Sequence, residues 1–124
     1  MSRIISAINA MISNPEMIKD VTKSYDSDDI FFTYDQKHKW SISRDAHNSS
    51  CLTYYPGAQS IQQLAGMENY EWSEFQEFIR YTTDEIGTSE AYESMGELYN
   101  VVKEKIYNMD KVLTEIIKTD EIPF

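Results

Sequence analysis

Residues 30–44 read IFFTYDQKHKWSISR, and this stretch decides the expected fold. Aromatic and β-branched side chains crowd both of its arms, as is typical of β-strands, and a polar turn over residues 35–39 separates them. A third run, CLTYYP at residues 51–56, alternates Leu52 and Tyr54 with Cys51, Thr53 and Tyr55. Three consecutive antiparallel strands form a meander with one face available for a hydrophobic core.

The residues before this meander have helical spacing. Apolar side chains recur every three or four positions from Ile4 to Ile12, which predicts a helix over residues 2–13. Asn14 and Pro15 then form a helix start, and we expect a second helix over residues 15–24. The acidic run at residues 24–29 resembles the opening of a calcium loop. However, Ile30 stands where a ligand is needed and the required Gly and Glu are missing, so a plain acidic turn is favoured.

Three helical patterns follow the meander. Ser60 and Gln63 have the spacing of a capping box, and Gly66 suits a helix stop. An apolar stripe from Trp72 to Ile86 predicts a second helix, closed by Gly87. Thr88 can cap a third helix, whose stripe continues to Ile117 as one helix or as two pieces divided near residues 108–110. The hydrophobic end EIPF, residues 121–124, leaves packing, docking and fraying all open.

The expected fold is therefore a single α+β domain over residues 1–124. It has N-terminal helices, a three-stranded antiparallel meander, and C-terminal helices packed on one face of the sheet. A chain of 124 residues suits one domain, and it buries enough surface for one ordinary core.

The charge of the chain bears on its partners. The formal net charge is −10, and fourteen of the 21 acidic residues lie after residue 65. Phosphate backbones and anionic lipids repel such a chain, so we expect neither nucleic-acid nor membrane binding, and a partner with a basic surface stays open. No apolar run is long enough for a membrane span, and the first 17 residues do not resemble a signal peptide. The single cysteine favours a reducing compartment, and we expect a cytoplasmic location.

The sequence offers little for catalysis. It has no Walker loop, no dinucleotide fingerprint, no nucleophile elbow and no H-E-x-x-H pair. His38 and His47 lie in or beside polar turns and lack the spacing of metal ligands. Cys51 would need a base or a positive field to act as a nucleophile, and a packing role at the start of a strand is favoured. We therefore expect no enzyme, no metal and no cofactor.

Acidic side chains form a stripe on the helix after Thr88. Glu93 and Glu97 stand four residues apart, a like-charge spacing that costs a few tenths of a kcal/mol, so local stability does not explain them. A solvated face and a docking surface for a basic partner both fit, and solvation is favoured. The docking hypothesis assigns the charge and its flanking aromatic anchors to Glu90, Glu93, Glu97, Glu104, Tyr92 and Tyr99.

The meander carries more aromatic rings than one face of three strands can bury. Packing of both faces is the favoured explanation. The alternative is an exposed aromatic surface with a basic rim, suited to protein recognition, formed by Phe31, Tyr55, Lys37, Lys39 and Arg44.

Three classes of function follow. The composition, without any shared motif, resembles that of small bacterial immunity proteins and phage-encoded inhibitors. The leading hypothesis is a non-enzymatic binding protein, of inhibitor or immunity type, that occludes a basic site on a partner. The first alternative is a structural or adaptor subunit that oligomerises or docks through the aromatic sheet or the C-terminal helix. The second is a small-ligand domain or an unrecognised enzyme.

Overall fold

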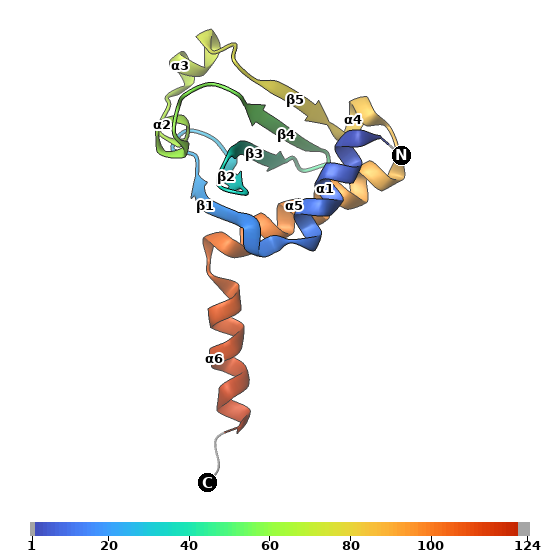
Figure 1. The fold of residues 1–124 in the computed structure, drawn as a ribbon, viewed down its shortest axis with the longest axis vertical. Helices are drawn as coiled ribbons and strands as arrows, with labels where there is room; N and C mark the ends of the chain where they lie inside the picture. The colour runs from blue at the N-terminus through green and yellow to red at the C-terminus, as the bar shows by residue number, and fades with distance from the viewer. Residues whose placement is uncertain (1, 122–124) are drawn as a thin grey trace.

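The structure is a computed structural model that describes residues 2–121, without the side chains of Asp110 and Glu121. The expectation for residues 122–124 lies outside this range. A five-stranded antiparallel sheet with helices forms the body (Figure 1), which confirms the α+β class. The elements in chain order are α1 (Arg3–Ser13), a short 3-10 helix η1 (Pro15–Met17), β1 (Ile18–Lys23), β2 (Ile30–Tyr34), β3 (His38–Arg44), β4 (Ser50–Tyr55), α2 (Ile61–Ala65), α3 (Asn69–Glu74), β5 (Ile79–Thr82), α4 (Thr83–Ile86), α5 (Ser89–Ile106) and α6 (Met109–Glu121).

The sheet is a meander in the order β1-β2-β3-β4-β5, so it contains the expected three strands and one more at each edge. The predicted hairpin is confirmed, because Phe32 on β2 pairs with Trp40 on β3, and the predicted third strand is confirmed by the pairing of Ile42 on β3 with Leu52 on β4.

The added first strand replaces the helix expected at residues 15–24, and that prediction was wrong. Only Pro15–Met17 is helical, and Ile18 then pairs with Tyr34 on β2. A bulge shifts the register between Lys19 and Thr22, and Asp20 has a positive φ of 55° there. A bulge inserts an extra residue, which breaks the period-two pattern by which a strand is recognised.

The added fifth strand overturns the helix expected from Trp72 to Ile86. Helix α3 ends at Glu74, and β5 then pairs Ile79 with Tyr54 and Tyr81 with Leu52. The run IRYTT at residues 79–83 is β-branched and aromatic, which suits a pleated surface. The apolar spacing of residues 79–82 also fits a helix, but these residues form a strand because they pair with β4.

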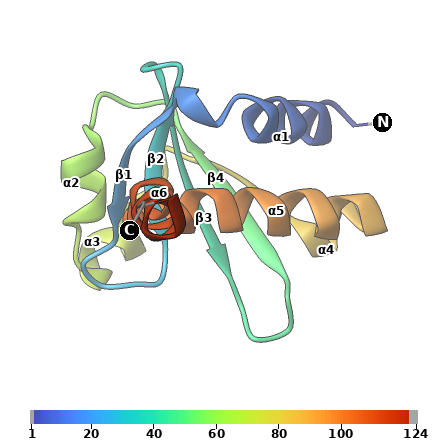
Figure 2. The same cartoon turned by 90° about the horizontal axis from the view of Figure 1, so that it is seen from below.

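Helices cover both faces of the sheet, which corrects the expectation of one covered face (Figure 2). Alternation along β2 explains this arrangement. Phe32 packs with residues of α1 and α5 in a first core cluster, whereas Phe31 packs with residues of α2 in a second. Both rings are fully buried, and burial of each contributes about 1.5–3 kcal/mol.

Hydrogen bonds cap the two helices of the first cluster and join them to each other. The Ser2 hydroxyl accepts from the backbone N–H of Ile5, and the Thr88 hydroxyl accepts from that of Ala91, at 3.3 and 3.1 Å. Ser94 on α5 donates to the side chain of Asn9 on α1 at 2.9 Å. The expected helix at residues 2–13 and the Thr88 cap are both confirmed.

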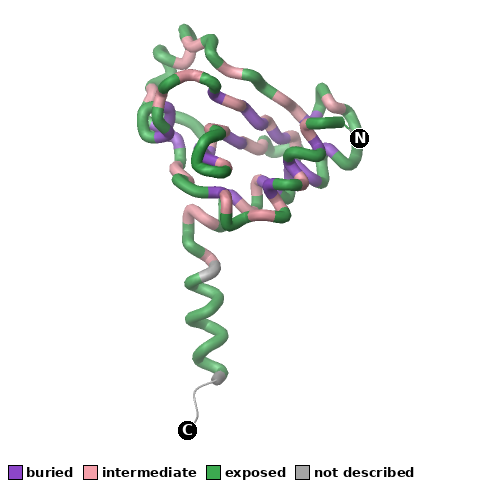
Figure 3. The backbone as a smooth tube through the Cα atoms, viewed as in Figure 1, coloured by how far each residue is buried: buried purple, intermediate pink, exposed green. Residues whose placement is uncertain are grey.

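The C-terminal stripe forms two helices. Helix α5 ends at Ile106, and Asn108 adopts a positive φ of 50°, a conformation that asparagine tolerates better than most residues. Helix α6 then extends away from the body of the molecule (Figure 1). Its residues 111–120 are all exposed, as the unbroken green of this segment shows (Figure 3).

Candidate binding surfaces

Helix α5 directs its acidic side chains outward because its apolar face is fixed in the first core cluster. Ala91, Met95, Leu98 and Val102 are completely buried against the sheet and α1. The four glutamates expected to form a docking surface, Glu90, Glu93, Glu97 and Glu104, are accordingly all exposed. Within residues 2–121 none of them forms an ion pair shorter than 4.0 Å.

A cation lies beside the centre of this surface. Arg44, at the end of β3, reaches α5 at Gly96, where a side-chain Cβ would lie 3.4 Å from its guanidinium. Arg44, Glu93 and Glu97 line one open hollow of about 600 Å³. The backbone of Gly96 faces this guanidinium, and a glycine in the middle of a helix is the sequence signal that could have revealed the contact. The charge of Arg44 offsets part of the repulsion between the two glutamates.

The remaining residues of the expected docking surface are spread along α5. Tyr92 borders the same hollow, and its hydroxyl donates to the Asp84 carboxylate, a bond that raises the pKa of the Tyr92 phenol. Tyr99 lies under the amino group of Lys103, 5.8 Å from its ring. Glu104 lines a different hollow beside β1. The structure thus groups Tyr92, Glu93 and Glu97 and separates them from Glu104.

The second expected surface differs from the structure. Phe31 and Tyr55 are only 1% and 4% exposed, because α2 and α3 cover their face of the sheet, so the favoured explanation, packing on both faces, holds for these rings. Lys37 lies 3.7 Å from Asp35 in the turn, and Lys39 donates to two backbone carbonyls after β4. Arg44, as described, lies against α5. The five residues form no common exposed surface.

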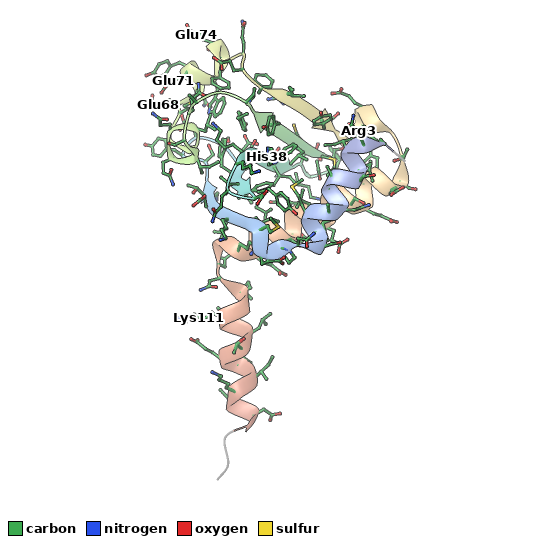
Figure 4. All side chains as sticks on the ribbon, in the orientation of Figure 1. Arg3, His38, Glu68, Glu71, Glu74 and Lys111 are labelled. Atoms are coloured by element: carbon green, nitrogen blue, oxygen red, sulfur yellow. The ribbon has the colours of Figure 1, made fainter. Side chains whose placement is uncertain are left out.

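An apolar face on α6 is exposed instead. Its large side chains recur at helical spacing, and their exposed fractions are 37% for Val112, 48% for Leu113, 60% for Ile116 and 59% for Ile117. Met109 begins the same stripe, and Lys111 extends from the helix as a labelled side chain in Figure 4. Within the described residues no other helix combines this length with so many exposed aliphatic side chains.

A hollow also opens on the sheet face covered by α2 and α3, and it contains Cys51. The Cys51 thiol lies 3.8 Å from the Thr53 hydroxyl, and burial raises the pKa of this thiol above its usual value. A raised pKa disfavours the thiolate that a nucleophile requires. Neither His38, which lies 3.3 Å from the Tyr54 hydroxyl, nor His47 contacts the thiol in the described part of the chain.

Residues 2–121 contain neither a side-chain cluster suited to a metal ion nor a helix that could span a membrane. No group of three or more His, Cys, Asp or Glu side chains there is placed to hold a metal ion. No helix in the same range is long and apolar enough to cross a bilayer.

The chain was compared with models of protein families, with curated proteins and with solved structures, and no match was found in any of the three.

Proposed function

We propose that this chain is a non-enzymatic binding protein that assembles with a second copy of itself through the apolar face of α6. This corresponds to the adaptor or oligomerising subunit among the classes that the sequence leaves open. The observation that carries the proposal is the exposure of four large aliphatic side chains, Val112, Leu113, Ile116 and Ile117, on one face of a helix that contacts little else.

The length of α6 supports a partner. Helices shorter than about 12–15 residues are marginal in water even in favourable sequences, and α6 has 13 residues. It also includes β-branched Val112, Ile116 and Ile117, which lower helix propensity. Burial of an amphipathic face supplies most of the stability of such a helix in proteins. A partner that covers the stripe would provide that stability.

The chemistry of the stripe favours a second copy as this partner. The four aliphatic side chains form an apolar patch that ends at Asp120, one turn after Ile116, whereas Lys111, Glu115 and Lys118 occupy the opposite side of the helix. An apolar patch offers nothing specific to a basic or an acidic partner, and it matches the same apolar patch on a second copy. A two-fold pair is the commonest form of such self-complementary contact.

The free energy gained by covering these four side chains sets the expected strength of the dimer. The four side chains are already partly buried, so covering each contributes about 1 kcal/mol, or about 8 kcal/mol for two helices. Association itself costs about 4–15 kcal/mol. The gain lies inside the range of this cost, so we propose a weak dimer that forms only at high concentration. The net charge of −10 on each chain adds repulsion, which salt screens, so the dimer strengthens as ionic strength rises.

Sedimentation of matched variants tests this proposal. Leu113→Glu places a charge on the stripe, and Thr114→Glu places the same charge on the neighbouring position, outside the stripe. Both positions are exposed, so neither variant disturbs the core. The wild type and Thr114→Glu are expected to approach twice the mass of one chain at high concentration, and Leu113→Glu to keep the mass of one chain. Equal masses for the two variants would show that the apolar face of α6 does not form the interface.

A second candidate keeps the leading hypothesis of the sequence, an inhibitor that occludes a basic site on a partner protein. The exposed glutamates on α5, which form no ion pair with any residue that the structure describes, favour it, since opposite potential speeds encounter and rejects wrong partners. The single cysteine suits a reducing compartment, and we place either activity in the cytoplasm.

Charge-matched variants test this second candidate. Glu93→Gln with Glu97→Gln removes two charges from α5, and Glu68→Gln with Glu71→Gln removes two from the distant end near α3 (Figure 4). A basic protein bound by wild type and by the α3 variant, and released by the α5 variant or by about 0.5 M salt, would support the docking surface. Equal capture by both variants would reject it.

A further inference from the structure

The hollow beneath α3 has the size of a ligand pocket. It measures about 580 Å³, within the range of about 300–1,000 Å³ that is usual for small-molecule sites. Its floor is the outer face of β3 and β4, where Ser43, Cys51 and Thr53 present small polar side chains. Small side chains at these positions leave the space that the aromatic rings above them do not fill.

Aromatic rings form the wall of this pocket. Trp72 of α3 lies edge-on to Phe75, with centroids 5.2 Å apart, and Phe75 lies parallel to Phe78, with centroids 6.3 Å apart. All three rings are only partly buried. Aromatic pairs prefer centroid separations of about 4.5–7 Å, so a planar ring that enters the pocket finds ring faces and edges to pack against.

Two opposite charges line the same pocket. The guanidinium of Arg80, on β5, lies 4.8 Å from the centre of the Phe78 ring, and it forms no hydrogen bond or ion pair with any residue that the structure describes. The Asp29 carboxylate accepts one hydrogen bond, from the Ser27 hydroxyl at 2.9 Å, and retains further acceptor capacity. The pocket thus offers the hydrogen-bond donors of Arg80 and the free acceptors of Asp29. The aromatic rings of its wall lie between the strands and solvent.

We infer that this pocket binds a small aromatic molecule that carries a carboxylate and, at a separate position, a hydrogen-bond donor such as an amino group. The ring packs against Trp72 and Phe75, Arg80 binds the carboxylate, and Asp29 accepts from the donor. Arg pairs with carboxylates through two parallel hydrogen bonds, which fixes orientation as well as charge. A single negative charge is favoured over a phosphate dianion, because Asp29 and the acidic chain repel the second charge.

This inference is independent of the assembly through α6, because none of the described side chains of α6 lines the pocket. A failure of either proposal therefore leaves the other standing. Cys51, on the pocket floor, and Trp72, on its wall, provide two local reporters.

Three related probes separate the contributions: 4-aminobenzoate has both groups, benzoate lacks the donor, and aniline lacks the carboxylate. Binding is measured by saturation-transfer NMR on the probes and by quenching of Trp72 fluorescence in Trp40→Phe protein. We expect 4-aminobenzoate to bind most tightly and aniline most weakly. Arg80→Gln should weaken 4-aminobenzoate about tenfold, whereas Lys111→Gln, an equal charge change on α6, should leave its binding unchanged.

Protection of Cys51 provides a second measurement that does not depend on Trp40→Phe folding normally. We expect 4-aminobenzoate to slow the alkylation of Cys51 in wild type and to have a much smaller effect in Arg80→Gln. An absence of saturation transfer from all three probes would overturn the inference. Equal binding and equal protection in wild type and Arg80→Gln would overturn it as well.

Discussion

The hydroxyl groups of Ser41 and Tyr55 lie 2.7 Å apart between the neighbouring strands β3 and β4. Both side chains are buried, at 1% and 4% exposed, within the sheet face that α2 covers. Burial raises the pKa of the Tyr55 phenol to about 12, and the bond from Ser41 lowers it by less than burial raises it. The pair thus satisfies two polar groups in an aromatic cluster and holds Tyr55 in its neutral form.

Removing one member of this pair should destabilise the fold. Tyr55→Phe leaves the Ser41 hydroxyl buried without its partner, which costs about 1–3 kcal/mol. The double variant with Ser41→Ala should recover part of this loss, since neither polar group then remains unpaired. Urea unfolding of the four proteins in the cycle measures the coupling, and strictly additive losses would show that the bond contributes nothing.

The raised pKa of Tyr55 predicts how stability depends on alkaline pH. Between pH 10 and about 12 the unfolded chain loses the Tyr55 proton and the folded chain keeps it, so the free energy of unfolding falls as pH rises, by about 2 kcal/mol. Below pH 10 the contribution of this group is fully present. Tyr55→Phe should flatten the decline, measured by denaturant unfolding at each pH. Parallel curves for the two proteins would contradict the assignment.

Two buried hydroxyl groups, that of Ser50 on β4 and that of Thr83 on α4, should respond differently when they are removed. The backbone N–H of Ser50 donates to the Thr83 hydroxyl at 3.1 Å, and Thr83 is fully buried. Thr83→Val keeps the shape and removes this acceptor, so we expect a loss of about 1–3 kcal/mol. The Ser50 hydroxyl itself has no hydrogen-bond partner among the described residues, so Ser50→Ala should be neutral or stabilising. Thermal unfolding of both variants checks the two signs.

Two glycines on either side of Thr88 form another matched pair. Gly96 has helical surroundings inside α5, and Gly96→Ala should raise stability by about 0.5–1 kcal/mol, since its Cβ meets Arg44 at an ordinary contact distance of 3.4 Å. Gly87 has a left-handed φ of 73°, where a side chain is strained, so Gly87→Ala should lower stability by about 1 kcal/mol. Destabilisation by Gly96→Ala would mean that Arg44 cannot yield at that site.

Local patterns predicted the elements that local chemistry determines. The hairpin of β2 and β3, the cap at Thr88 and the capping box of Ser60 with Gln63 all appear as expected, because each depends on residues close in sequence. The edge strands were missed for a physical reason. The bulge after Lys19 disturbs the alternation of β1. Strand β5 has only four residues, too few for a clear strand pattern, and its pairing with β4 determines its conformation.

The surfaces were predicted less completely, because they depend on distant residues. The exposure of Glu93 and Glu97 follows from the helical spacing of α5, but Arg44 comes from β3, 52 positions before Gly96. The pocket beneath α3 joins Asp29, Cys51 and Arg80 from three separated segments. The sequence shows the apolar stripe of α6, but only the structure shows that nothing within the described residues covers it.

Contacts between copies test the central claim, assembly through α6, most directly. An isotope-filtered NOE spectrum of equal amounts of labelled and unlabelled chain detects only contacts between copies. It should be recorded at high concentration and about 0.5 M salt, where repulsion is screened. We predict cross-peaks among the methyl groups of Val112, Leu113, Ile116 and Ile117, and their loss in Leu113→Glu. No cross-peaks at any concentration, or cross-peaks confined to the sheet or to α5, would contradict it.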